Sequence, residues 1–287
     1  MLDLHHKDGR LKYPRRRLTD DLRALGLAPG SLVMVHSSIR AVGPVHGGPD
    51  EIHLAIEDAV APGGTVAMIA SCQAGFDDVG RGVCSSEQEA DILAHQPAFD
   101  PATARADREN GALVEFFRSY PGTVCSRHAT GRIAARGKRA AWLTADQPWD
   151  YFFGRGSPLE KLCAAGGKVL LLGADHDTVT LLHYAEHVGD FPDKRVARYQ
   201  VPMLEYGKRV WRWCEEYDTS DRGAHARWPE RFFATIVDDF IASCDGSPTC
   251  ARGTVGDANS VLMDAAALVD HAIEMMVARA RGAPPAP

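Results

Sequence analysis

Short apolar runs alternate with amphipathic segments along most of this 287-residue chain. The runs 31–35, 64–70 and 168–174 predict buried strands, because four to eight consecutive apolar residues are typical of strands covered on both faces. The amphipathic segments predict helices at 20–27, from about 50, and at 111–120, 159–165, 178–188, 229–243 and 262–280. Strands that alternate with helices indicate an α/β fold.

Three other segments complete the expected fold. Residues 195–217 predict a β-hairpin that turns near 206–208, so we expect a mixed central sheet flanked by helices. Residues 71–105 predict a long irregular loop, which in a compact domain is usually functional. Two short strands fit within 123–136. We treat 1–287 as one domain, with a disordered tail at 281–287.

Composition excludes several classes of protein. The net charge is -6 and no basic stripe stands out, which argues against a nucleic-acid partner. The one basic cluster, Arg15–Arg17, is expected to be a solvated patch before a first helix that Thr19 caps. The sequence contains no run of about 18 apolar residues, so no membrane-spanning helix is predicted. It also shows no apolar signal segment near its start, so a cytoplasmic location is expected.

Cysteine usage points to free thiols. The chain has seven cysteines, an odd number, and no C-x-x-C pair. Disulfide scaffolds and zinc ribbons usually show even counts or closely spaced pairs. Free thiols in a reducing compartment are therefore expected.

The sharpest candidate for chemistry is the segment Leu182–His187. On a helix His183, Glu186 and His187 share one face, because they lie three and four residues apart. An imidazole oriented by a carboxylate suits general-base catalysis, whereas the H-x-x-E-H spacing also suits zinc. A solvated helix face with an ordinary ion pair remains the third interpretation.

A second candidate follows the first predicted strand. His36, Ser37 and Ser38 lead from that strand into a loop rich in glycine. Such a turn can present N–H groups and hydroxyls to a pyrophosphate. The segment matches neither the P-loop nor the dinucleotide fingerprint, so an ordinary strand-end turn is the alternative.

Two acidic clusters suggest a cationic ligand. Asp77-Asp78 lies in the predicted irregular loop, and 215–218 (EEYD) ends the predicted hairpin. Clusters of this kind are usually solvated surface charge. If both faced one cleft they would favour a substrate with several amines, because neighbouring carboxylates are costly without a cation.

Several motifs, in order along the chain, resemble the aminoglycoside 3-N-acetyltransferase family of the non-GNAT type. The resemblance runs from about residue 18 to 280. The matching segments are Val33–Gly43, Phe99–Thr103, Gly111–Arg118, Phe153-Gly154, Ser157-Pro158, VLLLG at 169–173, Thr180–Glu186, Phe191–Arg195, Gly256–Ser260 and Asp264-Ala265.

The chain departs from the family pattern near the expected pockets. The usual Arg-Ser-x-His-Pro run is Cys125–Ala129 here, and the usual Met-Pro after the second strand is Met68-Ile69. A family tryptophan is replaced around Cys72, and the segment 75–96 is longer than in close relatives. These departures bear on which antibiotic is accepted more than on the reaction.

The resemblance implies an α/β/α sandwich whose N-terminal part mainly binds CoA and whose C-terminal part mainly binds substrate. The catalytic residues it implies are His183, Glu186 and Asp77. The residues it implies for CoA are His36, Ser37, Ser38, Ile39, Arg40, Val42, Gly43 and Ser126. The substrate contacts it implies are Asp77, Asp78, Glu216 and Asp218.

The expected reaction is direct transfer of the acetyl group of acetyl-CoA to the 3-amine of an aminoglycoside, giving antibiotic resistance. His183 is the expected base, and no metal is expected. Another polyamine-like or biosynthetic amine is the alternative substrate. The sequence also leaves open an acyl-cysteine route, a zinc hydrolase built on His183, Glu186 and His187, and a non-catalytic binding protein. We expect a monomer or a homodimer.

Overall fold

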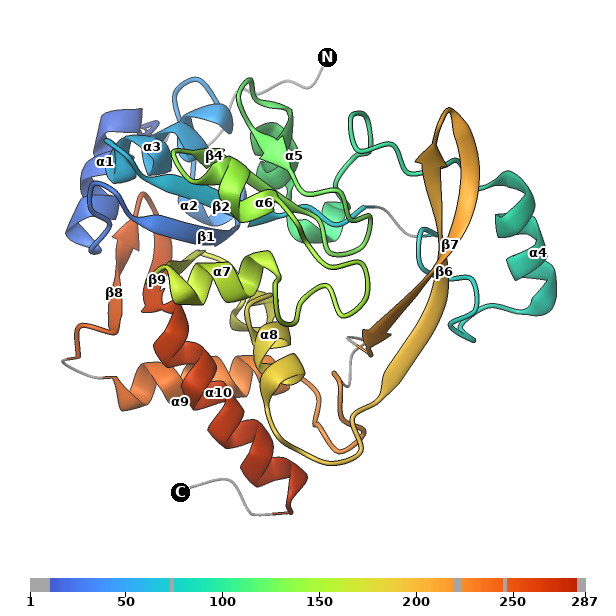
Figure 1. Cartoon of the computed structure of the whole chain (residues 1–287). Helices are drawn as coiled ribbons and strands as arrows, with labels where there is room; N and C mark the ends of the chain where they lie inside the picture. Colours follow the sequence, from blue (N-terminus) through green and yellow to red (C-terminus); the bar gives the residue numbers. More distant parts are fainter. Residues whose placement is uncertain (1–10, 73–74, 219–222, 245–246, 283–287) are drawn as a thin grey trace.

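A mixed seven-stranded sheet forms the centre of the molecule (Figure 1). The computed structural model describes residues 11–72, 75–218, 223–244 and 247–282. The sheet order is β3-β4-β2-β1-β5-β9-β8, with β1 parallel to both β2 and β5. Its strands are β1 (Leu32–Ser37), β2 (Thr65–Ile69), β3 (Val124–Cys125), β4 (Ile133–Gly137), β5 (Lys168–Leu172), β8 (Cys250–Val255) and β9 (Ala258–Asp264).

Helices cover both faces of this sheet and bury two hydrophobic cores. One face packs on α1 (Arg15–Ala24), α3 (Asp50–Val60) and α5 (Ala112–Ser119). The helices on the other face are α6 (Ala140–Thr144), α7 (Pro158–Ala164), α8 (Leu182–Val188), α9 (Phe232–Ser243) and α10 (Ala265–Ala280). Alternation along β1 sends Val33 and Val35 to the first core and Leu32 and Met34 to the second. The expected α/β sandwich is confirmed.

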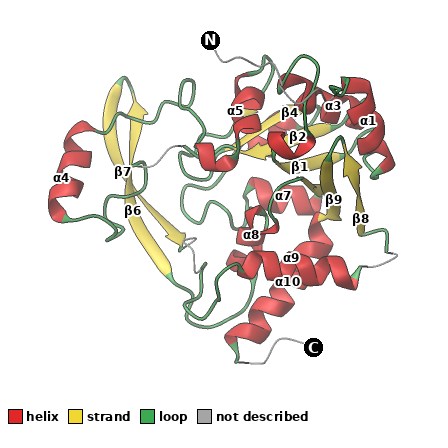
Figure 2. Ribbon diagram, turned by 180° about the vertical axis from the view of Figure 1, so that it is seen from behind, coloured by secondary structure: helices red, strands yellow, loops and turns green. Residues whose placement is uncertain are grey.

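The predicted hairpin exists, but it forms a separate two-stranded sheet. Strands β6 (Val196–Glu205) and β7 (Lys208–Tyr217) pair along their full length and turn at Tyr206-Gly207. Figures 1 and 2 show this hairpin standing apart from the central sheet. The mixed character of the central sheet comes instead from β4 and β9, which run antiparallel to their neighbours.

Two helix predictions at the ends of the chain are wrong. α1 spans Arg15–Ala24, so Arg15–Arg17 form its first turn, and the hydroxyl of Thr19 donates to Arg15 O within the helix rather than capping it. The segment expected to be a helix from residue 262 completes β9 before α10 starts at Ala265.

The segment 71–105 is not wholly irregular, because it contains α4 (Ser86–His95). Ser85 and Gln88 form a reciprocal capping box at its start. Arg209 of the hairpin donates to Ala94 O and Gln96 O at its end, at 3.0 and 2.5 Å. Figure 1 shows α4 on the far side of the hairpin from the central sheet.

The carboxyl ends of β1 and β5 meet at one edge of the sheet. Short helix α2 (Ile39–Val42) follows β1, while η2 (His176–Thr178) and α8 follow β5. Gly173 at the end of β5 has φ +64°, and a Cβ there would collide with Ala41 of α2. Glycine thus lets the two segments approach at this edge, where ligands of α/β proteins gather. None of the helices in the described residues has the length and apolar character that crossing a membrane requires.

Candidate active site

His183 and Glu186 form a hydrogen-bonded pair on α8. The ring Nδ1 lies 2.6 Å from Glu186 Oε2, and the backbone N–H of Ala224 donates to Glu186 Oε1 at 2.9 Å. An ionised carboxylate can only accept, so Nδ1 carries the ring proton and Nε2 keeps its lone pair. Glu186 is fully buried, whereas the His183 side chain is 21% exposed. The arrangement leaves one imidazole nitrogen able to accept a proton from a ligand.

Neighbouring residues fix the orientation of this pair. Phe153 stacks on the His183 ring with centroids 5.3 Å apart, and Phe233 lies 5.0 Å away on a tilted plane. Gly223 has φ +59°, and a Cβ there would collide with Glu186 Oε1. Phe153 belongs to a motif noted in the sequence, but Phe233 and Ala224 are contacts that no sequence signal identified.

A second pair, His187 with Glu216, lies one helical turn further along α8. Nδ1 of His187 donates to His183 O at 2.6 Å, because a carbonyl can only accept, and Nε2 contacts Glu216 Oε1. Both side chains are buried, at 2% and 1% exposure. Glu216 was expected to contact substrate, but its carboxylate is enclosed and engaged by His187. The structure therefore ties β7 to α8 through this pair.

Lys194 closes the end of α8. Its Nζ donates to His187 O at 2.8 Å, which satisfies a carbonyl of the last turn. The ammonium also lies over the rings of Phe191 and Tyr217, with centroid distances of 4.7 and 4.8 Å. Burial lowers the pKa of Lys194, and the carboxylates of Asp190 and Glu186 oppose this shift.

The residues expected to bind CoA lie at the end of β1 and in α2. His36 and Ser37 end β1, and Ser38 caps α2 by accepting from Ala41 N–H at 3.3 Å. Arg40 on α2 is exposed. A recess of about 300 Å³ adjoins this segment. It is lined by Lys12, Ile39, Gly43, Pro44, Val45, Gly47, Gly48, Pro49 and Ile52.

Two of the expected CoA residues have structural contacts instead. The Val42 side chain is fully buried in the core, and its carbonyl accepts from Asp257 N–H at 3.0 Å. Ser126 is also fully buried, and its hydroxyl accepts from Ile133 N–H at 2.9 Å. Neither side chain is open to a cosubstrate in this geometry, so any contact of these two residues with CoA would involve their backbone atoms.

The remaining acidic candidates lie around the hairpin. Asp77 pairs with Arg81 at 2.9 Å, and Arg81 lies over the Tyr199 ring, on the face of the hairpin that also carries Glu216. Burial raises the pKa of Asp77, and Arg81 opposes that shift. Asp78 is half-buried beside it, and Asp218 pairs with Arg195. Glu215 accepts from the Tyr151 hydroxyl at 2.5 Å. The two acidic clusters therefore adjoin one hairpin, as the sequence suggested, although four of their five carboxylates already have partners.

The geometry does not favour a zinc site, and burial disfavours an acyl-cysteine route through Cys72 or Cys214. Both ring nitrogens of His187 are engaged, so it has none left for a zinc ion shared with His183. In the part of the chain that the structure describes, no group of three or more His, Cys, Asp or Glu side chains is arranged to hold a metal. Burial raises the pKa of Cys214 to about 12 and that of Cys72 to about 11, which keeps both thiols protonated and poorly nucleophilic.

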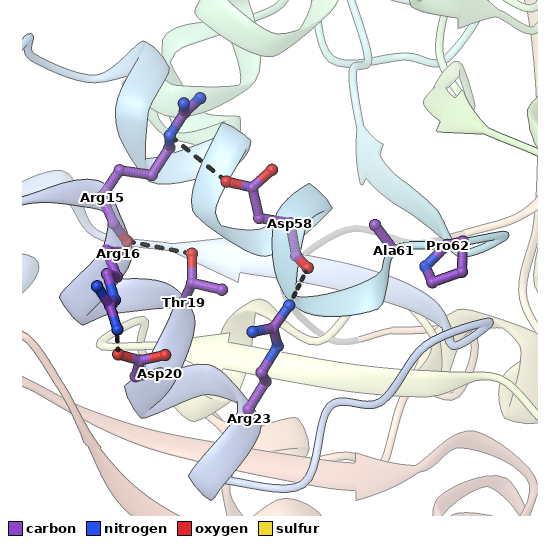
Figure 3. A pocket seen from close by; sticks show the side chains of 8 residues that line it. All are labelled: Arg15, Arg16, Thr19, Asp20, Arg23, Asp58, Ala61 and Pro62. Atoms are coloured by element: carbon purple, nitrogen blue, oxygen red, sulfur yellow. Dashed lines mark hydrogen bonds and ion pairs between the residues drawn. The ribbon is translucent and has the colours of Figure 1, made fainter.

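A larger surface recess, of about 670 Å³, lies on α1 and the end of α3 (Figure 3). Two of its three arginines face carboxylates: Arg15 lies 3.4 Å from Asp58, and Arg16 lies 3.9 Å from Asp20. The third, Arg23, donates to the backbone carbonyl of Asp58 at 2.8 Å. Pro62 in this recess precedes β2, so the recess lies at the amino end of that strand. It is thus remote from the carboxyl edge that carries His183.

Comparison with known proteins agrees with this arrangement. The family described as aminoglycoside 3-N-acetyltransferase matches residues 34–277. Aminoglycoside N(3)-acetyltransferase III of Pseudomonas aeruginosa is 40% identical over 95% of this chain and 96% of its own length. Two solved structures superpose well. AAC-IIIb in binary complex with CoASH has 43% identity and a TM-score of 0.86, covering 96% of this chain and 100% of that one. AAC-VIa bound to sisomicin has 36% identity and a TM-score of 0.84, covering 94% and 99%.

These similarities define the chain as an acyltransferase of the α/β/α type. It belongs to the aminoglycoside 3-N-acetyltransferase family. The resemblance inferred from the ordered motifs is confirmed.

Proposed function

We propose that this enzyme transfers the acetyl group of acetyl-CoA to the 3-amine of an aminoglycoside, with His183 as general base. The observation that carries the proposal is the His183–Glu186 pair, which leaves Nε2 of an oriented imidazole exposed at the carboxyl edge of the sheet. The CoA complex of AAC-IIIb and the sisomicin complex of AAC-VIa support the two ligands.

The base is needed because an aminoglycoside amine is largely protonated near pH 7. In the proposed reaction His183 Nε2 takes a proton from the 3-ammonium, and the nitrogen lone pair attacks the thioester carbonyl carbon. The C–N bond forms and the C–S bond breaks. Two protons leave the ammonium nitrogen in all: one passes through His183 to the departing CoA thiolate, and the second is released to solvent when the tetrahedral adduct collapses to the amide. The products are therefore the N-acetylated amine, CoA thiol and one proton.

Glu186 would keep His183 in the productive tautomer and stabilise its charged form. Its own position is fixed by Ala224 N–H. Such a held carboxylate orients the ring and stabilises the imidazolium that forms when the amine is deprotonated.

The acidic residues around the hairpin would hold the other ammonium groups of the substrate. Asp77, Asp78 and Asp218 are partly exposed and lie on or beside the hairpin that Glu216 ties to α8. We propose direct contacts for these three, while buried Glu216, paired with His187, holds the hairpin in place. Fixing several ammonium groups aligns the 3-amine and reduces the entropy cost of attack.

CoA would enter beside α2, where the segment 36–43 adjoins the 300 Å³ recess. A thiol-release assay with acetyl-CoA tests the whole proposal. We expect turnover with aminoglycosides that carry a 3-amine, none with an analogue lacking that amine, and acetylation at N3 when the product is examined by NMR. Release that does not depend on the 3-amine would contradict it.

A further inference from the structure

His36 begins the segment beside which CoA is proposed to enter, and its ring lies close to His183, but no chemical step has yet been given to its side chain. Its side chain follows Met34 on the same face of β1, because side chains two residues apart in a strand point the same way. The core on that side of the sheet also contains Leu182 and Ala185 of α8, and the His36 ring lies close enough to His183 for the two to interact electrostatically. The imidazole of His36 therefore projects from the carboxyl end of β1 toward the helix that carries His183.

The His36 ring is buried without satisfying its hydrogen-bonding capacity. The residue is 6% exposed, and Nε2 is fully buried with no hydrogen-bond partner among the described residues. A buried polar nitrogen without a partner costs free energy and is rare in native structures, so it calls for a ligand or a water. Buried His128 and His187 have hydrogen-bond partners in Trp149 O and Glu216. The Nε2 atoms of His53 and His271 also lack a hydrogen bond, but they lie 3.4 and 3.0 Å from carboxylate oxygens.

The ring of His36 is also held neutral. Burial lowers its pKa to about 4, and the nearby His183 adds to the shift. A neutral imidazole carries one N–H donor and one acceptor, whereas a second cation beside His183 would oppose proton uptake by the base. A neutral donor next to a base is suited to a carbonyl oxygen that gains negative charge.

We propose that His36 is a catalytic residue whose ring N–H donates to the thioester carbonyl oxygen of acetyl-CoA and stabilises the oxyanion formed when the amine attacks. The inference rests on the proposed function, since it requires the thioester to lie between β1 and α8. The donor moves no proton, and the bonds formed and broken stay as described above. Preorganised donors of this kind act mainly on the transition state.

Three variants separate this role from simple cosubstrate binding. His36→Leu removes the donor at similar volume, His36→Gln keeps an N–H donor, and His95→Leu changes a histidine that is 76% exposed on α4. We expect His36→Leu to lower kcat about 10²-fold with the KM for acetyl-CoA changed less than about threefold. His36→Gln should recover at least about tenfold of that loss, and His95→Leu should match wild type.

Other outcomes would overturn the proposal. Wild-type kcat in His36→Leu would remove the role, and equal losses in the Leu and Gln variants would make the residue structural. A loss confined to the KM for acetyl-CoA would make His36 a binding residue only. If wild type releases no thiol with any aminoglycoside, the proposed function fails first, which is distinct from failure of the His36 role alone.

If His36→Leu does not fold, the hydrogen bond from His36 to the carbonyl can still be tested with the wild-type enzyme. A ketone analogue of acetyl-CoA, with CH₂ in place of the sulfur, retains the carbonyl but cannot transfer it. Its carbonyl stretch should move to lower frequency when bound to wild type, and the ring ¹⁵N signals of His36 should change on binding. An unshifted carbonyl and unchanged His36 signals in a saturated complex would rule out the hydrogen bond.

Discussion

Helix α8 carries two His–Glu pairs one turn apart, and they differ in what each leaves free. In the first, Glu186 holds Nδ1 of His183 while Nε2 remains accessible. In the second, both ring nitrogens of His187 have partners, the His183 carbonyl and the Glu216 carboxylate, and both side chains are buried. The same two residue types thus form a proposed catalytic base in one place and a structural tie in the other. Access to the second nitrogen, not the presence of the pair, marks the candidate base.

The largest effect is expected from removing the imidazole of His183, the ring with the accessible nitrogen. His183→Ala should lower kcat by about 10²–10⁴-fold, because the amine then loses its general base. Thiol release measures kcat, and CoA binding by calorimetry should be nearly unchanged. His95→Ala on α4 is the matched control. Wild-type turnover in His183→Ala would remove the proposed role.

The next test keeps both rings but alters the tautomer of His183. In Glu186→Gln the amide oxygen should keep accepting from Ala224 N–H, which turns the amide NH₂ toward His183 Nδ1. Nδ1 then becomes an acceptor and Nε2 carries the proton, so the ring cannot act as a base. We expect kcat to fall about 10²-fold with little loss of stability. A variant whose kcat stays within threefold of wild type would show that Glu186 does not set the tautomer.

Substitutions in the buried His187–Glu216 pair should show the opposite pattern, with a large effect on the free energy of unfolding and a small effect on kcat. Glu216→Leu and His187→Leu each leave a buried partner uncompensated, which typically costs about 3–5 kcal/mol in the free energy of unfolding. The double variant should lose much less than the sum of the two. Urea denaturation of all four proteins measures this coupling.

The same pair also tests the role that the resemblance gave Glu216. If its carboxylate touched substrate directly, the milder Glu216→Gln would raise the KM for aminoglycoside at least tenfold. The enclosed geometry predicts a smaller change in KM. A tenfold rise without loss of stability would therefore return Glu216 to the substrate site.

A third histidine, the buried His128, is expected to make the free energy of unfolding depend on pH. Gly131 N–H donates to Nδ1 of His128, so Nε2 donates to Trp149 O, and burial lowers the His128 pKa to about 4 from 6.5. Between those values the unfolded chain binds more protons than the folded one. The free energy of unfolding should therefore fall as the pH drops from about 6.5 to 4, by up to about 3 kcal/mol for this group.

His36, with its pKa also lowered to about 4 by burial, adds to this acid sensitivity in the same window. Urea denaturation at several pH values, in wild type and in His128→Asn, isolates the contribution of His128. The variant should show a shallower dependence on pH below 6.5. Equal slopes in the two proteins would mean that His128 is not held neutral by the fold.

The sequence predicted the local parts of this site well. β1, β2 and β5 were apparent as apolar runs, and His183–Glu186 follows from helical spacing alone. The His187–Glu216 pair joins residues 29 positions apart and depends on how β7 packs against α8, which no periodicity encodes. The partial enclosure of Asp77 and the unsatisfied nitrogen of His36 likewise arise only from tertiary packing.

The errors in the fold have particular causes. The apolar residues Val261, Leu262 and Met263 of β9 are followed almost directly by the alanines at the start of α10. The sequence pattern was therefore interpreted as one helix, although it contains a strand and a helix. The Gly256-Asp257 dipeptide, which is typical of a two-residue hairpin turn, was the signal for the β8–β9 hairpin. The capping box at Ser85 and Gln88 similarly marked α4 inside the segment expected to be irregular.

The Arg16–Asp20 pair in the recess of Figure 3 is a solvent-exposed ion pair, in contrast to the buried His187–Glu216 pair. The two side chains are 93% and 57% exposed and 3.9 Å apart, so water and salt screen their attraction. Arg16→Ala should change the free energy of unfolding by less than about 0.5 kcal/mol and leave kcat unaltered. Thermal denaturation at low and high salt checks this. A loss comparable to that of Glu216→Leu would show that burial does not separate structural from dispensable ion pairs here.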